Sequence, residues 1–352
     1  MKQKKLFLFA TIAIFSSFLS SYEEKVINIV GKISMFKAYK NCLYFLNSSE
    51  GNIWRFDQEL KLLNKIGEKG EGPGEVSNLS NFNFLEDKIY TFSRNRLLIF
   101  GLDGTLLNEV KIPPTNNFYL LLKNGNFIEK TRDFSYEKGK TIIQKIRFLD
   151  KDFNQIIEIL DERLEVTPGY QFEAIEPFIS VKYSDKTDLV YISNPVRDFL
   201  IMIFDENGKQ IGKVFKHCER IKVRKEYKEK FAETLIHDPH ITSKQMADAF
   251  LKQLHFPKYF PPFHSFFLDD EGNVYIRTYK KKNNKTIFEK YSPKGIFLRE
   301  YLLEDKYINI VDSHLFISFS AGNYYYLYED ENGDYISYRE KLYKHFPTRI
   351  QR

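Results

Sequence analysis

Short runs in which apolar and polar residues alternate recur along most of this chain. Such alternation, in segments rich in aromatic and β-branched residues, predicts β-strands. Six of the runs share an aromatic centre and read CLYFL (Tyr44), KIYTF (Tyr90), GNFIE (Phe127), LVYIS (Tyr191), NVYIR (Tyr275) and HLFIS (Phe316). A strand that recurs six times in this form indicates a repeated all-β unit.

The spacing of these centres identifies the unit. A second strand follows most of them, and turns such as Asp103-Gly104 then connect it to a further strand, as in antiparallel hairpins. Three of the five intervals are close to the roughly 40–50 residues of a four-stranded propeller blade. The intervals on either side of Tyr191 are longer and require insertions. The pattern therefore predicts an all-β fold, a six-bladed β-propeller.

A propeller must also close its ring, because an open ring leaves an unpaired strand edge. We expect the run YEEKVINIV, residues 22–30, to add a strand to the last blade, near NYYYLYEDENGDYISYREKL. The strand–helix–strand alternation of a parallel α/β sheet is absent from the sequence.

Residues 222–262, between the fourth and fifth predicted blades, carry the only helical pattern after the N-terminal segment. Apolar residues recur there every four positions, at Val223, Tyr227, Phe231 and Leu235. After a break at HDPH, Thr242 and Gln245 occupy the positions of a capping box. The prolines of FPKYFPP end the second helix. We therefore predict a two-helix insertion between blades 4 and 5.

The first 21 residues, MKQKKLFLFATIAIFSSFLSS, have the layout of a secretory signal peptide: a basic start, an apolar run and small residues at the end. This predicts an extracytoplasmic protein (periplasmic, in the cell envelope or secreted) whose propeller spans residues 22–352, with no transmembrane span after cleavage. An uncleaved N-terminal anchor is the alternative.

The charge pattern and the cysteines bear on the expected partners and on disulfide bonding. Losing Lys2, Lys4 and Lys5 would lower the formal net charge of +6 by three, and the remaining basic residues are interleaved with acidic ones. A nucleic-acid partner would need a concentrated basic face, so none is expected. Cys42 and Cys218 show no spacing signature, and the sequence leaves open whether they pair.

The segment IGEKGEGPGEV, residues 66–76, resembles a phosphate-binding loop only in its glycine content. A P-loop needs Lys-Ser or Lys-Thr where this chain has Pro73-Gly74, followed by a helix. The next residues instead alternate as in a strand. We interpret the segment as a tight connection between two blades, with glycines at positive φ and Pro73 stiffening the turn.

This segment also carries a family resemblance. It is similar to the G-x-x-G-x-G-P-G-E segment of six-bladed β-propellers of the bacterial cell envelope, an NHL-like repeat family; the matching residues are Gly67, Gly70, Gly72, Pro73, Gly74 and Glu75. Val76 stands where that family usually has an aromatic residue. The run PPFHSFFLDDEGNVYIRTY resembles a later blade of the same family. The resemblance implies the propeller fold and an extracytoplasmic location, in a family whose members mostly lack an assigned activity.

Arginines just beyond four strand centres form the candidate binding site, namely Arg94, Arg132, Arg197 and Arg277. In a propeller, loops at the strand ends crowd one end of the central channel, where guanidinium groups bind anions through forked hydrogen bonds. We therefore predict an acidic ligand there, such as a glycan or a peptide end. The four offsets from the aromatic centres differ, so ordinary solvated arginines are the alternative.

Catalytic and metal signatures are weak in this sequence. No G-x-S-x-G, H-E-x-x-H or C-x-x-C motif occurs, and His237 and His240 lie at a helix break. Some propeller lyases and hydrolases hold a divalent ion in the channel; Glu129, Asn194 and Asp198 are the candidate ligands for such an ion here. We predict no catalytic residues and no resident cofactor, with the channel ion as the alternative.

The prediction that follows is a monomeric, exported binding module for an envelope protein, a peptide or a glycan, contacted through the face that carries the insertion. A metal-dependent lyase or hydrolase is the alternative, and a structural part of a larger envelope complex is a third. Fold analogy alone does not supply a reaction.

Overall fold

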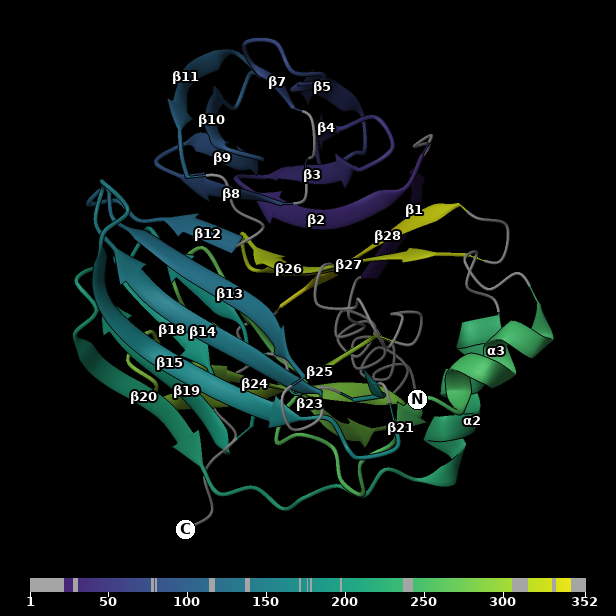
Figure 1. The fold of residues 1–352 in the computed structure, drawn as a ribbon. Helices are drawn as coiled ribbons and strands as arrows, with labels where there is room; N and C mark the ends of the chain where they lie inside the picture. Colours follow the sequence, from purple (N-terminus) through teal and green to yellow (C-terminus); the bar gives the residue numbers. More distant parts are fainter. Residues whose placement is uncertain are drawn as a thin grey trace, which may run out of the picture.

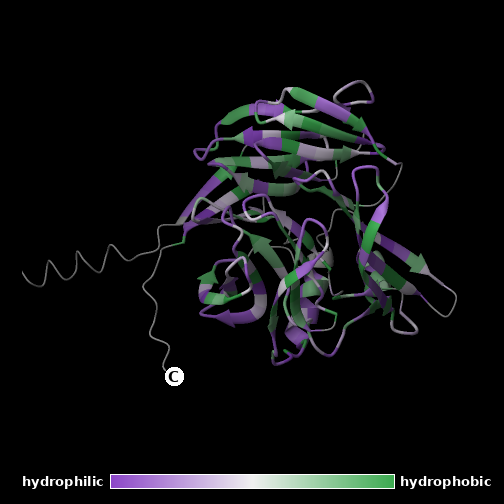
Figure 2. Ribbon diagram, turned by 90° about the vertical axis from the view of Figure 1, so that its left-hand side faces the viewer, coloured by the Kyte–Doolittle hydropathy of each residue, from purple (hydrophilic) through white to green (hydrophobic). Residues whose placement is uncertain are grey.

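The structure is a computed structural model (Figure 1), and it describes residues 22–27, 31–76, 79, 81–113, 118–136, 140–170, 172–175, 177, 179–196, 198–236, 243–305, 316–330 and 334–342. These residues form six four-stranded antiparallel sheets, the blades. Hydrophobic and hydrophilic positions alternate along their strands (Figure 2). The predicted six-bladed β-propeller is confirmed.

Each blade is numbered here in chain order. Blade 1 contains β2 (Ile33–Tyr39), β3 (Cys42–Asn47), β4 (Asn52–Phe56) and β5 (Leu62–Ile66). Blade 2 contains β8 (Phe82–Leu85), β9 (Lys88–Ser93), β10 (Arg96–Gly101) and β11 (Leu106–Lys111). Blade 3 contains β12 (Phe118–Leu121), β13 (Phe127–Ser135), β14 (Thr141–Leu149) and β15 (Gln155–Glu165).

The second half of the ring repeats this order. Blade 4 contains β17 (Val181–Ser184), β18 (Leu189–Ser193), β19 (Phe199–Asp205) and β20 (Gln210–Lys216). Blade 5 contains β22 (Ser265–Leu268), β23 (Val274–Lys282), β24 (Lys285–Tyr291) and β25 (Phe297–Leu303). Blade 6 contains β26 (Ile317–Ser320), β27 (Asn323–Glu329), β28 (Tyr335–Lys341) and, from the N-terminal end, β1 (Tyr22–Ile27).

Strand β1 closes the ring. It pairs antiparallel with β28, in a register that runs from Tyr22 opposite Glu340 to Ile27 opposite Tyr335. The predicted closure by the N-terminal run is therefore confirmed for residues 22–27, and residues 28–30 lie outside the described part of the chain.

The aromatic centres do not mark the innermost strands of the blades. Five of them lie on the second strand of a blade, and Phe316 directly precedes β26. The innermost strands are instead β2, β8, β12, β17, β22 and β26. A second strand packs against neighbouring blades on both faces, so its apolar pattern is nearly continuous and dominates the sequence signal. All six residues of β3, for example, are buried.

Aromatic side chains fill the space between blades. Between blades 5 and 6, the rings of Tyr275 and Phe319 stack with their centres 4.0 Å apart. Between blades 6 and 1, Phe36 and Tyr325 meet edge to face at 6.5 Å. Such pairs add specific geometry to the area that the large rings bury, which explains the chain's 16% aromatic content.

The insertion between blades 4 and 5 contains α2 (Lys225–Ile236) and α3 (Lys244–Leu251), which lie side by side away from blades 1 and 2 (Figure 1). Ser243 caps α3, since its hydroxyl accepts a hydrogen bond from the Met246 N–H at 3.2 Å. The cap predicted at Thr242 is therefore wrong by one residue. A short parallel pair, β16 (Phe172–Glu173) with β21 (Leu254–His255), ties the insertion to the loop after blade 3.

None of the helices in the described ranges is long and apolar enough to cross a membrane. The predicted signal peptide, residues 1–21, lies outside these ranges.

The glycine-rich segment connects blades 1 and 2 and is held by its own groups. Within it, β6 (Glu68–Lys69) and β7 (Glu75–Val76) form a short parallel pair. The Glu75 carboxylate accepts a hydrogen bond from the Gly72 N–H at 2.7 Å, and Arg96 donates to the carbonyls of Gly72 and Glu75 at 2.9 and 2.8 Å. Gly74 adopts a φ of +74° that favours glycine. The segment therefore forms a short strand pair and a turn, not the loop and helix N-terminus of a phosphate site.

Gly70→Ala should lower the free energy of unfolding by about 1–3 kcal/mol, because a Cβ there would lie 1.9 Å from Glu75 Oε2 and displace a hydrogen-bonded carboxylate. Urea denaturation measures this. In a Glu75→Ala background the same substitution should cost much less, because its obstacle is gone. Additive effects of the two substitutions would contradict the contact.

Candidate functional site

A large cavity in the described part of the chain is the central channel. Its volume is about 1010 Å³, and residues of all six innermost strands line it. Because blades radiate from this axis, side chains far apart in the sequence meet here. A concave site of this size, with a few polar groups among apolar walls, is typical of ligand-binding pockets.

Among the basic residues that line the channel, Lys37 and Lys182 lie on the innermost strands of opposite blades. Lys37 lies on β2 of blade 1, and Lys182 lies on β17 of blade 4. The Lys37 Nζ donates to the Phe82 carbonyl and to Asn83 Oδ1, both at 2.6 Å. The Lys182 Nζ lies 5.8 and 5.7 Å from the ring centres of Phe266 and Phe267. Neither ammonium forms an ion pair with any carboxylate in the described part of the chain.

Burial and mutual repulsion both act on this pair. Burial and, to a smaller extent, the positive charge of Lys182 together lower the pKa of Lys37 to about 7. Burial alone lowers the pKa of Lys182 to about 8. The side chains of Lys37 and Lys182 are half-buried, and both line the channel. A pair of half-buried cations without a counterion is a strong attraction for an anion.

Flat aromatic walls surround these lysines. Tyr39 and Phe84 stack with ring centres 4.2 Å apart, and both line the channel together with Phe118 and Phe319. These faces suit a ligand with an apolar or ring-shaped part beside its charged group.

The turns that follow the innermost strands form a charged rim at one mouth of the channel. The cavity-lining residues there are Lys40, Glu86, Asp87, Asp185, Lys186, Asp269 and Asp270, so acidic groups outnumber basic ones. Several of the carboxylates already have partners. Asp87 pairs with Lys40 and accepts a hydrogen bond from the Tyr39 hydroxyl at 2.9 Å. Burial and, second, this hydrogen bond raise the pKa of Tyr39. An anion therefore has its best site deeper in the channel.

The structure separates the three predicted arginines that it describes. Arg94 is exposed in the β9–β10 turn and pairs with Glu71 at 2.5 Å. Arg277 is buried and donates to Asp305 Oδ2 through Nε and Nη2 at 3.0 and 2.7 Å. Arg132 lines the channel, and Arg197 lies outside the described residues. Neither Arg94 nor Arg277 is among the residues that line the channel.

The candidate ligands of a channel ion also lie elsewhere. Glu129 accepts hydrogen bonds from the Tyr119 hydroxyl at 3.2 Å and from Arg147 at 3.1 Å. Asn194 donates to Glu162 at 2.8 Å, and Asp198 lines the second cavity. Over the described ranges, no three His, Cys, Asp or Glu residues are grouped so as to hold a metal ion. His237 and His240 fall outside those ranges.

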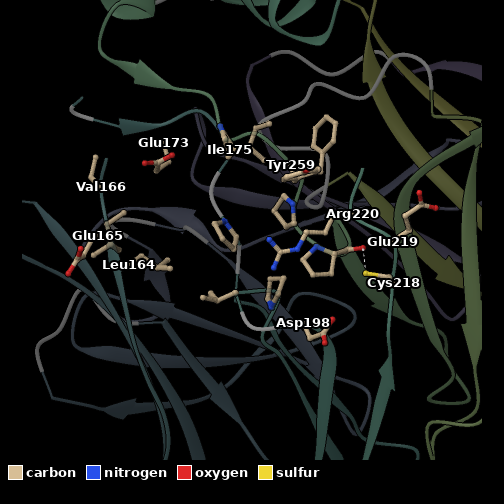
Figure 3. A pocket seen from close by; sticks show the side chains of 18 of the residues that line it. Leu164, Glu165, Val166, Glu173, Ile175, Asp198, Cys218, Glu219, Arg220 and Tyr259 are labelled. Atoms are coloured by element: carbon tan, nitrogen blue, oxygen red, sulfur yellow. Dashed lines mark hydrogen bonds between the residues drawn. The ribbon is translucent and has the colours of Figure 1, made fainter. Parts of the chain in front are cut away.

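The second cavity is a cleft of about 580 Å³ between the long strands of blade 3, the end of blade 4 and the insertion (Figure 3). Five prolines line it, namely Pro177, Pro195, Pro257, Pro261 and Pro262. Arg220 lies near its centre, with Cys218 on one side and Glu173 on the other (Figure 3). At its edge, Glu173 and His255 lie 2.7 Å apart. Burial acts to raise the pKa of Glu173, but the hydrogen bonds with His255 and Thr167 outweigh it and lower that pKa.

Both cysteines are free. Cys42 is buried in blade 1, whereas Cys218 lies beside the cleft, where burial raises the pKa of its thiol. A raised thiol pKa disfavours the thiolate and hence a nucleophilic role.

Sequence reasoning missed Lys37 and Lys182. The available signal was a single lysine within each of two short apolar runs, ISMFKAY and VKYS. That signal is weak, because an outward-facing lysine on a half-buried strand gives the same pattern.

Comparison with known proteins assigns this fold to a family. A family described as 6-bladed beta-propeller matches residues 23–291. A search of curated proteins gave no match.

Two crystal structures share the fold. A Bacteroides fragilis protein proposed to be exported aligns with a TM-score of 0.51 and 16% identity, over 93% of this chain and 98% of that one. A member of the DUF4221 family from Bacteroides vulgatus aligns with a TM-score of 0.51 and 10% identity, over 92% and 97% of the two chains. At these identities the likeness concerns the fold alone. On the family match, the chain belongs to the 6-bladed beta-propeller family.

Proposed function

We propose that the protein is an exported binding module whose central channel holds a carboxylate-bearing ligand between Lys37 and Lys182. The observation that carries this proposal is the pair of half-buried ammonium groups, contributed by opposite blades and without a carboxylate partner in the described residues. Placing two like charges in one cavity costs free energy, which a bound anion offsets.

The aromatic residues that line the channel indicate the class of ligand. Aromatic rings line the channel beside the lysines, so an acidic sugar or the carboxylate end of a peptide has both an apolar face and a charged group to contribute. The signal-like residues 1–21 support export, and such ligands occur outside the cytoplasm in the cell envelope.

A thermal-shift titration with glucuronate tests the proposal, with glucose as the uncharged control. A ligand at ten times its Kd stabilises a protein by about 1.4 kcal/mol, which corresponds to a rise in Tm of roughly 2–4 °C. Glucuronate should produce such a rise and glucose should not. Lys182→Met should abolish it, whereas Lys209→Met, on an exposed turn, should not. Equal shifts with both sugars, or none with a wider set of carboxylates, would overturn the proposal.

The pH dependence has a defined sign. The lysines are charged below a pKa of about 7 for Lys37 and about 8 for Lys182, so anion binding should be strongest below pH 7 and weaken through pH 7–8. Without ligand the effect is reversed. The unfolded chain holds its lysine protons up to about pH 10, so between pH 8 and 10 it binds more protons than the folded one and stability rises with pH.

Lys182→Met should therefore raise the Tm of the ligand-free protein at pH 7. It should also reduce the increase in Tm between pH 7 and pH 10. A lysine that served only the fold would lower the Tm when removed. Melting curves of both proteins across this pH range separate the two roles.

A further inference from the structure

A patch of exposed aromatic side chains lies where the end of β13 meets the insertion. Among the described residues, six aromatic side chains are exposed. Two of them, Phe215 and Phe297, lie apart on the outermost strands of blades 4 and 5. The other four belong to this region, called here the aromatic patch: Phe134, Tyr136, Tyr170 and Phe172. Exposed aromatic residues that gather in one place indicate a binding surface.

Two basic side chains lie over the rings of the aromatic patch. The Lys140 Nζ is 4.2 Å from the ring centre of Phe172 and 5.2 Å from that of Phe134. The Arg132 guanidinium lies 5.5 Å from the Phe134 ring centre. Phe172 also contacts Phe250 of α3, with ring centres 5.7 Å apart. These contacts link the end of blade 3 to the insertion as one surface, in which aromatic rings alternate with positive charges.

Arg132 joins this surface to the central channel, because it also lines the channel. Lys130, two residues earlier, pairs with Phe118, the first residue of β12. Arg132 therefore lies beyond the start of an innermost strand, whereas the acidic rim is formed by the turns that follow the innermost strands. An anionic chain that enters at the end marked by Arg132 meets positive charge there and avoids the acidic rim.

We propose that the channel ligand is the end of an acidic polysaccharide, a polyuronate, and that the sugars next to this end lie on the aromatic patch. This inference rests on the proposed function, because the terminal sugar occupies the channel site. It adds a second surface outside the channel, and it selects an acidic sugar chain over the carboxylate end of a peptide.

The chemistry of the aromatic patch matches such a chain. The face of an aromatic ring carries partial negative charge, so the polarised C–H groups of a sugar ring pack favourably against it. Arg132 and Lys140 bring the guanidinium and ammonium groups that bind carboxylates. Each unit of a polyuronate has both a ring face and a carboxylate. A neutral glycan would match only the rings, and an acidic peptide would match only the positive charges.

A series of chain lengths tests this inference. Galacturonate, trigalacturonate and pentagalacturonate are titrated into the full mature protein in a calorimeter. Pentagalacturonate should bind roughly tenfold or more tightly than galacturonate, because its additional sugars gain contacts with two or more rings. Maltopentaose is the uncharged chain and pentaglutamate is the charged chain without sugar rings. Both should bind more weakly than pentagalacturonate.

Single substitutions separate the aromatic patch from the channel. Phe134→Ser and Tyr136→Ser each remove an exposed ring and should weaken pentagalacturonate binding by about 2- to 10-fold. Neither should change the affinity for galacturonate. Phe297→Ser is the matched control, since Phe297 is 51% exposed against 48% for Phe134 and lies on the outermost strand of blade 5. It should leave both affinities unchanged, whereas Lys182→Met should weaken the binding of both ligands.

The outcomes distinguish this inference from the proposed function. Equal affinities for galacturonate and pentagalacturonate would overturn the role of the aromatic patch and leave the channel site standing. Pentagalacturonate binding that depends on Phe134 but not on Lys182 would instead overturn the channel site. Pentaglutamate that binds as tightly as pentagalacturonate would overturn the choice of a sugar chain.

Discussion

Arg277→Met should lower the free energy of unfolding by about 3–5 kcal/mol. Arg277 donates two hydrogen bonds to Asp305, whose side chain has 0% exposure. Removing the arginine leaves a carboxylate in the interior with Lys281, at 3.7 Å, as its one remaining ion-pair partner among the described residues. Breaking a buried pair by removing one partner typically costs this much, because the remaining charge stays desolvated. Urea or guanidinium denaturation of the mature protein measures the loss.

Two variants make this prediction specific. Arg94→Met removes an arginine from an exposed pair with Glu71, and such a pair contributes only about 0–1 kcal/mol. The double variant Arg277→Met with Asp305→Leu removes both buried charges and should recover much of the loss. An equal effect of Arg94→Met and Arg277→Met would contradict the assignment of Arg277 to the fold. Neither variant should change the shift that glucuronate produces.

Deletion of Tyr22–Ile27 should destabilise the protein by at least about 3 kcal/mol and promote self-association. The deletion removes every β1–β28 backbone pair and the buried side chain of Ile27, which packs with Ile33 and Phe36 between blades 6 and 1. Loss of a buried isoleucine side chain alone costs about 2–5 kcal/mol. The uncovered edge of β28 then presents free N–H and C=O groups to other chains.

Thermal denaturation and size-exclusion chromatography measure the two effects of this deletion. Val26→Ser is the matched control, since that side chain is 56% exposed and its loss should change stability by less than about 0.5 kcal/mol. An unchanged Tm after the deletion would show that the ring does not depend on β1 for closure.

Much of the fold was predictable because it is encoded locally. Alternating runs predicted the strands, and turn residues such as Asp103-Gly104 predicted the hairpins between them. The insertion was found from its period of four, although its second helix is capped by Ser243 rather than Thr242. One error was systematic: the strands with the strongest apolar signal are the second strands of the blades, because both their faces are covered.

The candidate site was predicted poorly for the same physical reason. The predicted arginines lie on or just beyond second strands, and of the three in the described residues only Arg132 borders the channel. The channel is lined by the innermost strands, which are short and combine apolar with polar residues. Lys37 and Lys182 are 145 positions apart in the chain, since 182 − 37 = 145, and no local pattern links them.

By itself the sequence determined the all-β class, the number of blades, the closing strand and the place of the insertion, because each depends on residue periodicity and turn chemistry within a few tens of residues. The segment IGEKGEGPGEV likewise indicated a connection between blades rather than a phosphate site. Only the tertiary structure decided which side chains share the channel. That choice depends on which face of each innermost strand turns toward the axis, and on burial that removes water from Lys37 and Lys182 and brings their charges together.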